Sequence, residues 1–221
     1  MRWFRATCVV IAAIVLNVSP ALGQTVGFDD IDASAGDVSL DALGAYQGLS
    51  WSNFYGYTTT PGFDGFNNGI VSQSNAAYSG GQTFEGGLTP VVGSIQSTSA
   101  FDFLSADLGA GYYDGLSLTI TGYLGAAQLY TQTLTLGTTG AQSFGFSFSG
   151  IDRLTFSAFT TAGSSDPFAC GAFNCTQFTM DNMAIRAADV TSPIPEPSTA
   201  LMLLPGLGLV MAFRLRRRKP S

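Results

Sequence analysis

The sequence predicts an all-β body, an antiparallel jelly-roll-like β-sandwich, with an N-terminal signal peptide and a C-terminal transmembrane helix. In the middle of the chain, apolar residues alternate with Ser, Thr and Gly instead of recurring at helical spacing. Short stretches of this kind are separated by turn residues, which is typical of a sandwich. Long apolar stretches occur only near the two ends.

Strands are clearest in the second half, where apolar and polar residues alternate strictly. A turn at residues 122–126 indicates a hairpin, and residues 150–152 are predicted to turn the chain into the next strand. Residues 58–62 and 72–81 are predicted to be loops. The expected strands are 25–28, 49–59, 69–74, 82–84, 99–108, 116–121, 128–136, 144–148, 154–158 and 178–185.

Residues 1–23 have the pattern of a secretory signal peptide. Two arginines precede the apolar core 6–16, and Ala21 and Gly23 are the small residues of a cleavage site. We therefore expect the mature chain to begin at Gln24 and to form one sandwich domain over residues 24–189.

The C-terminal end has a linker, an apolar span and a basic stop, in that order. Residues 190–197 form a linker that ends in Pro195, Glu196 and Pro197, and the prolines keep it extended. Residues 198–215 are expected to form a transmembrane helix, and 216–221 a cytoplasmic tail. The basic stop consists of Arg214, Arg216, Arg217, Arg218 and Lys219.

This order resembles the PEP-CTERM sorting signal of exported bacterial proteins, a type of tail that also occurs on some ice-binding proteins. The resemblance implies export by the Sec machinery, anchoring in the inner membrane by the C-terminal helix, and recognition by exosortase. The protein would then reach the cell surface or the extracellular space. Such tails are associated with exopolysaccharide-producing bacteria, which implies a non-enzymatic structural or interaction role in the polysaccharide matrix. A plain C-terminal anchor is the alternative.

The body also looks like a group of exported PEP-CTERM proteins. The matching stretches are short, and they imply a fold type and no activity. They are residues 28–30, 48–54, 101–103 and 178–183.

The charge of the body excludes several classes of partner and of enzyme. Residues 24–192 carry fourteen acidic side chains against Arg153 and Arg186, so we expect no binding to nucleic acid. The chain contains no His, which excludes Ser-His-Asp and Cys-His catalysis. A glycan hydrolase that uses Glu85 is the remaining enzymatic alternative. Cys170 and Cys175 are expected to form a disulfide after export.

Three acidic residues are candidate ligands of a structural Ca²⁺ ion. Asp29 and Asp30 open the body and Asp181 nearly closes it. In the jelly-roll carbohydrate-binding modules that this layout resembles, the first and last strands often lie side by side and share a calcium ion, which binds oxygen ligands. The alternative is that these residues form turns and solvated edges.

Two candidate binding surfaces follow from residue type. Trp51, Tyr55 and Tyr57 cluster in one stretch and are candidates for stacking on sugar rings, with core packing as the alternative. Thr131, Thr133 and Thr135 share one face of a strand, as the threonines of an ice-binding surface would. That function would need the row repeated on several strands, and the sequence shows one row, which is ordinary strand composition.

Overall fold

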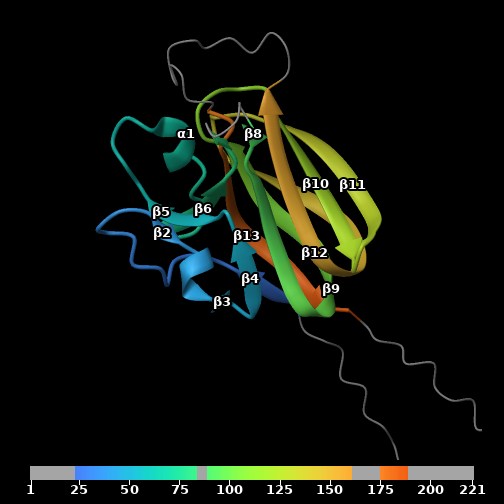
Figure 1. Cartoon of the computed structure of the whole chain (residues 1–221). Coiled ribbons are helices and arrows are strands. Elements are labelled where there is room, and N and C mark those ends of the chain that lie inside the picture. The colour runs from blue at the N-terminus through green and yellow to red at the C-terminus, as the bar shows by residue number, and fades with distance from the viewer. Residues whose placement is uncertain (1–22, 84–88, 161–174, 189–221) are drawn as a thin grey trace, which may run out of the picture. The chain divides into compact units, whose positions relative to one another are not determined.

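The computed structural model describes residues 23–83, 89–160 and 175–188 of the 221-residue chain (Figure 1). Within these ranges the secondary structure is almost entirely β, which confirms the predicted all-β class. The elements are β1 (Gln24–Val26), β2 (Val38–Ser39), η1 (Asp41–Leu43), β3 (Ala45–Tyr46), β4 (Leu49–Ser52), β5 (Tyr55–Thr58), α1 (Asp64–Asn67), β6 (Asn75–Ser79), β7 (Gln82–Thr83), β8 (Thr89–Pro90), β9 (Val92–Ala110), β10 (Leu116–Leu124), β11 (Ala127–Leu136), β12 (Gln142–Thr160) and β13 (Phe178–Ala187).

Several predictions concern residues outside the described ranges and stay predictions. They are the signal peptide up to residue 22, Glu85, Cys170, the linker with its Pro195-Glu196-Pro197 motif, the 198–215 span and the basic residues after it. Within 23–83, 89–160 and 175–188, no helix has the length and apolar character needed to cross a membrane.

The two longest strands, β9 and β12, have 19 residues each and pair antiparallel with each other. Register shifts between residues 145 and 153 of β12 mark bulges, which increase the bend of a strand pair. Residues 94–96 of β9 pair with β4 on their other edge, whereas residues 101–110 pair with β13. The same two strands therefore contribute to both layers of the sandwich.

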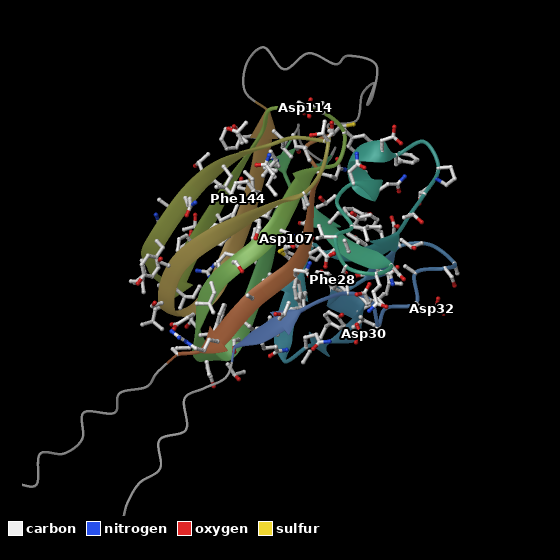
Figure 2. The ribbon with its side chains drawn as sticks, turned by 180° about the vertical axis from the view of Figure 1, so that it is seen from behind. Phe28, Asp30, Asp32, Asp107, Asp114 and Phe144 are labelled. Atoms are coloured by element: carbon white, nitrogen blue, oxygen red, sulfur yellow. The ribbon has the colours of Figure 1, made fainter. Side chains whose placement is uncertain are left out.

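The remaining strands extend the two layers. β10 and β11 continue from the last part of β12, while β6, β5 and β2 continue from β13. Figure 1 shows β9, β12, β10 and β11 as long curved strands side by side, with β2 to β6 gathered at one side. Seen from behind in Figure 2, the blue β1 lies beside the orange β13, in agreement with their antiparallel pairing. This confirms the expectation that the first and last strands are neighbours.

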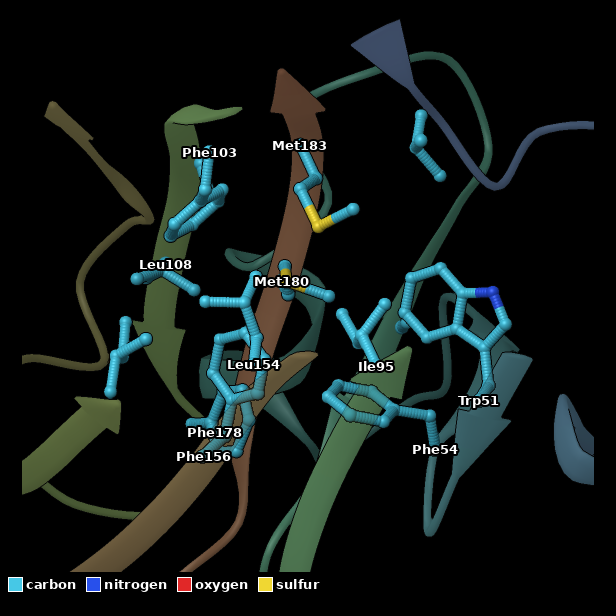
Figure 3. Packing of buried hydrophobic residues seen from close by; sticks show 14 of the residues in the cluster. Trp51, Phe54, Ile95, Phe103, Leu108, Leu154, Phe156, Phe178, Met180 and Met183 are labelled. Carbon is cyan, nitrogen blue, oxygen red and sulfur yellow. The ribbon is translucent and has the colours of Figure 1, made fainter. Parts of the chain in front are cut away.

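The core lies between the two layers and is rich in aromatic rings (Figure 3). Phe156 of β12 stacks on Phe178 of β13 with 5.7 Å between ring centroids. Phe54 packs edge-on against both, at 5.5 and 6.0 Å, and all three side chains are fully buried. Because Phe156 and Phe178 belong to different layers, their contact holds the layers together.

The turn predicted at residues 150–152 is wrong, because these residues continue β12. Gly150 has a φ of 67°, and its N–H donates to Oδ1 of Asp102 at 2.9 Å. The other oxygen of Asp102 accepts a bond from Arg186 at 2.6 Å. A glycine can adopt positive φ without a steric penalty, so the strand bends here without reversing.

Three predictions in the first half are also wrong. Residues 69–74 form a loop rather than a strand, and the strand β6 lies within the predicted loop 72–81. The predicted strand 49–59 is broken into β4 and β5 at Asn53, whose φ is 60°. Residues 71–74 do not pair as a strand, and the N–H groups of residues 71–75 donate to aspartate carboxylates instead, as described below.

Candidate functional site

An aromatic pocket of about 260 Å³ is the candidate site, because five aromatic rings and a carboxylate line it. Its rings come from β5, the loop after β5, α1, β6 and the loop after β9. We call these five rings the aromatic cage: Tyr57, Phe63, Phe66, Tyr78 and Tyr112. The described part of the lining is completed by Asp37, Thr60 and Gln177.

Phe66 is the central ring of the cage, and the other rings stand nearly perpendicular to it. Its plane makes angles of 88° with Tyr57 and 90° with Tyr78, each at a centroid distance of 5.5 Å. Tyr112 lies at 82° and 5.0 Å, and Phe63 at 80° and 6.3 Å. Edge-to-face contacts of this kind are favourable, and here they pack the rings into one cluster that lines the pocket.

The cage combines buried and accessible rings. Tyr57 and Phe66 are buried, Tyr78 and Tyr112 are partly buried, and Phe63 is 43% exposed. A ligand that enters the pocket would therefore contact Phe63, Tyr78 and Tyr112 before it reaches the central ring.

Asp37 supplies a carboxylate to the pocket. It lies on the loop before β2, is exposed, and its Oδ2 accepts a hydrogen bond from the Tyr78 hydroxyl at 2.9 Å. Burial raises the pKa of Tyr78, and the hydrogen bond to Asp37 raises it further. Burial followed by the charge of Asp37 also raises the pKa of Tyr112. These two hydroxyls therefore stay protonated and neutral well beyond neutral pH.

Local hydrogen bonds and small residues hold α1 in place. The Asn67 side chain accepts from the N–H of Thr60 and donates to its carbonyl, both at 2.9 Å. The Tyr57 hydroxyl donates to the carbonyl of Phe66 at 2.7 Å. A Cβ atom added at Gly111 would lie 2.6 Å from the Phe66 ring, so only glycine allows this close approach at the end of β9.

The three aromatic residues predicted to bind a ligand have three different environments. Tyr57 lines the pocket. Tyr55 is 40% exposed and stacks on Tyr78 at 5.4 Å, but it is not part of the pocket lining described above. Trp51 is buried in the core, where its Nε1 donates to the carbonyl of Tyr46 at 3.0 Å. The indole ring therefore has no face available for stacking on a ligand.

Asp181 is fully buried and holds the start of the 71–75 loop. Its Oδ2 accepts from the N–H groups of Val71 and Ser72 at 2.9 and 2.7 Å. Its Oδ1 accepts from the N–H of Asn182 at 2.8 Å. Asn182 has a φ of 46°, and its amide donates to Asp107 at 2.9 Å. Buried carboxylates need partners of this kind.

Asp29 holds the other end of the same loop. It accepts from the N–H groups of Ser74 at 2.7 Å, Asn75 at 3.1 Å and Gln73 at 3.3 Å. Desolvation alone would raise the pKa of Asp29, but bonds from these groups and from the Ser72 hydroxyl outweigh it. The pKa of Asp29 therefore lies below its usual value.

The predicted calcium ligands fit that role poorly. Asp30, on the loop after β1 (Figure 2), accepts from the Tyr46 hydroxyl and from the Gln47 amide. The oxygens of Asp29 and Asp181 face N–H donors, which a cation would have to displace. Within the described ranges, no group of three or more carboxylate or thiolate side chains is placed to hold a metal ion. The calcium hypothesis stays a prediction, and we derive no role from it.

The threonine row is repeated across strands, which the sequence did not show. Thr131 of β11 pairs in register with Thr121 of β10, then with Thr155 of β12 and Ser94 of β9. The hydroxyls of Thr131 and Thr121 lie 3.5 Å apart. Thr121 is only 9% exposed, so the centre of this ladder offers little surface to a ligand.

Comparison with known proteins gives different results for the C-terminal tail and for the sandwich body. The fold defines a β-sandwich protein. Residues 193–219 match the PEP-CTERM protein-sorting motif, so the chain is a β-sandwich protein that carries this motif. The motif implies exosortase processing, export and membrane-associated sorting to the cell surface. No curated protein is similar enough in sequence to count as a match.

Three solved structures are similar to part of this chain, at low values. The K2 cleaved adhesin domain of Lys-gingipain has 8% identity and a TM-score of 0.41, over 75% of this chain and 99% of that one. CBM32-3 from a family 31 glycoside hydrolase of Clostridium perfringens has 15% identity and a TM-score of 0.36, over 72% and 99%. A DUF4465 family protein from Bacteroides ovatus has 12% identity and a TM-score of 0.38, over 77% and 90%. At these values the similarities carry no argument about binding.

Proposed function

We propose that this protein is a non-enzymatic surface protein whose sandwich binds a glycan in the aromatic cage. The observation that carries the proposal is the gathering of five rings and three polar side chains around one pocket of about 260 Å³. The C–H faces of sugars pack on aromatic rings, while their hydroxyls need a few well-placed polar partners. Asp37, Thr60 and Gln177 would supply these partners.

The sorting motif supports a location at the cell surface for this glycan binding. We infer that exosortase processes the tail after Sec-dependent export and insertion of the C-terminal helix into the inner membrane. The sandwich, which we take to be jelly-roll-like, would then act in the extracellular polysaccharide matrix. A glycan hydrolase is the alternative, and its candidate Glu85 lies outside the described residues.

Truncation of an accessible ring should weaken glycan binding without unfolding the protein. Phe63 is 43% exposed, so Phe63→Ala removes a cage wall at little cost in core packing. We expect an affinity loss of about threefold to tenfold, the range for one aromatic contact. A glycan array identifies the ligand, and titration calorimetry with that ligand measures the loss.

Phe159→Ala is the matched control for this titration. Phe159 is also a large exposed ring, at 41%, but it lies on β12 and does not line the cage. The proposal fails if no glycan on the array binds, or if the two variants lose affinity equally.

The sorting part of the proposal is tested by replacing Pro195, Glu196 and Pro197 together with alanine. We expect the tail of the wild type to be cleaved and the protein to be released from the inner membrane, because exosortase recognises this motif. The variant should stay in the inner-membrane fraction with the larger intact mass of the uncut tail. Equal masses and equal locations would indicate a plain membrane anchor instead.

A further inference from the structure

Building on the proposed glycan-binding function, we propose that the aromatic cage selects a cationic sugar, one whose ring carries a protonated amine. The cage and the Asp37 carboxylate are the two groups that would recognise the charge. This inference names the ligand class that the pocket prefers, whereas the proposed function requires only that some glycan binds there.

The geometry of the rings suits a cation. The faces of aromatic rings carry negative electrostatic potential, so a cation enclosed by several rings is attracted to each of them. Phe66 forms the inner wall, and Tyr57, Tyr78, Tyr112 and Phe63 stand at 80° to 90° to it. All five rings line the same pocket, so a small group bound there would contact more than one ring, which a single flat stacking platform does not offer.

The charges around the pocket have the matching sign. Asp37 lines the pocket, and its Oδ2 is 2.9 Å from the hydroxyl of Tyr78, so a negative charge stands beside the rings. None of the described lining residues is basic. The body as a whole contains many more aspartates than arginines, which attracts cations and repels anions.

The pocket favours an amine on a sugar over a bare ammonium ion. Its volume of about 260 Å³ leaves room for a ring beside the charged group. Thr60 and Gln177 supply a hydroxyl and an amide, which suit the hydroxyl groups of a sugar.

Two oligosaccharides that share one backbone, and differ in whether their amines are free and charged or acetylated and neutral, test this inference. The full chain, purified in a detergent without a sugar head group, is titrated calorimetrically with a β-1,4-linked glucosamine tetramer and with its fully N-acetylated counterpart. The pH is chosen so that the amines are protonated. We expect the glucosamine tetramer to bind about fivefold more tightly, and this preference to shrink as salt is added.

Three variants test which residues cause the preference for the glucosamine tetramer. Asp37→Asn should weaken binding of the glucosamine tetramer by about twofold to fivefold and leave the acetylated tetramer unaffected, because the amide still accepts the Tyr78 hydrogen bond. Asp64→Asn removes the same charge from α1 outside the pocket lining and should keep the preference. Tyr112→Ala leaves every charge in place and should weaken the glucosamine tetramer by about fivefold, which separates the cage from general attraction to an acidic surface.

Each result has one meaning. Equal affinity for the two tetramers, tighter binding of the acetylated one, or a preference that persists in Asp37→Asn overturns the inference. If neither tetramer binds but another glycan on the array does, the selection of an amine is wrong and the proposed function stands. If no glycan binds at all, both are wrong.

Discussion

Phe178→Ala should lower the free energy of unfolding by about 3–5 kcal/mol, the usual cost of removing a buried aromatic ring from a core. Phe178 is fully buried on β13, stacks on Phe156 at 5.7 Å and contacts Phe54 at 6.0 Å. Its ring joins the two layers, so the cavity left behind cannot close unless the layers shift. Urea unfolding followed by circular dichroism measures the change.

Phe159→Ala is the control for this experiment as well. Phe159 is 41% exposed on β12, so its removal should change the unfolding free energy by less than about 1 kcal/mol. Similar losses for the two variants would show that the layers do not pack through Phe178.

Asp181→Asn should lower the free energy of unfolding by about 3 kcal/mol, because it removes a fully buried charge that accepts three backbone N–H bonds. The amide oxygen of asparagine can replace one carboxylate oxygen. Its NH₂ group would face the N–H donors that the other oxygen now satisfies. The start of the 71–75 loop would then lose its anchor on β13.

Asp64→Asn is the control for the Asp181 variant, because Asp64 is exposed on α1 and the substitution has the same chemistry. We expect it to be neutral within about 0.5 kcal/mol. Thermal melts of the wild type with and without a chelator separate the two interpretations of Asp181. The N–H contacts predict no shift, whereas a lower melting temperature with chelator would support the calcium hypothesis.

The period-two pattern was enough to predict the strands of the second half. The alternation around Leu118 and Ile120 corresponds to β10, and the aromatic alternation of 144–148 falls within β12. Alternation cannot tell a bulge from a turn, however, because both interrupt the pattern with a glycine. The interruption at Gly150 was therefore read as a turn, although the strand only bends there.

The candidate site could be predicted only in part. Tyr57, Phe63 and Phe66 lie close together in the sequence and stand out as an aromatic cluster. Asp37, Tyr78 and Tyr112 are far from them in the chain, and only the pairing of β6 with β5 and β13 and the end of β9 bring them together. No local signal marks these three residues.

The contacts of the acidic residues could also be predicted only in part. Asp29 and Asp181 anchor the two ends of one loop, which agrees with the expectation that the first and last strands are neighbours. Their partners did not follow, because backbone N–H groups leave no trace in the sequence. Most of the donors come from residues 71–74, which lie within the predicted strand 69–74 and would there have had a ladder of hydrogen bonds of their own.

Saturation-transfer NMR on the full chain with its best-binding glycan tests the central claim most directly. The account predicts that irradiation of the aromatic protons of the protein transfers signal to the ring protons of the sugar. It also predicts that the transfer disappears in a Phe63→Ala, Tyr112→Ala double variant that remains folded. Transfer that is unchanged in the double variant would place the ligand elsewhere and contradict the account.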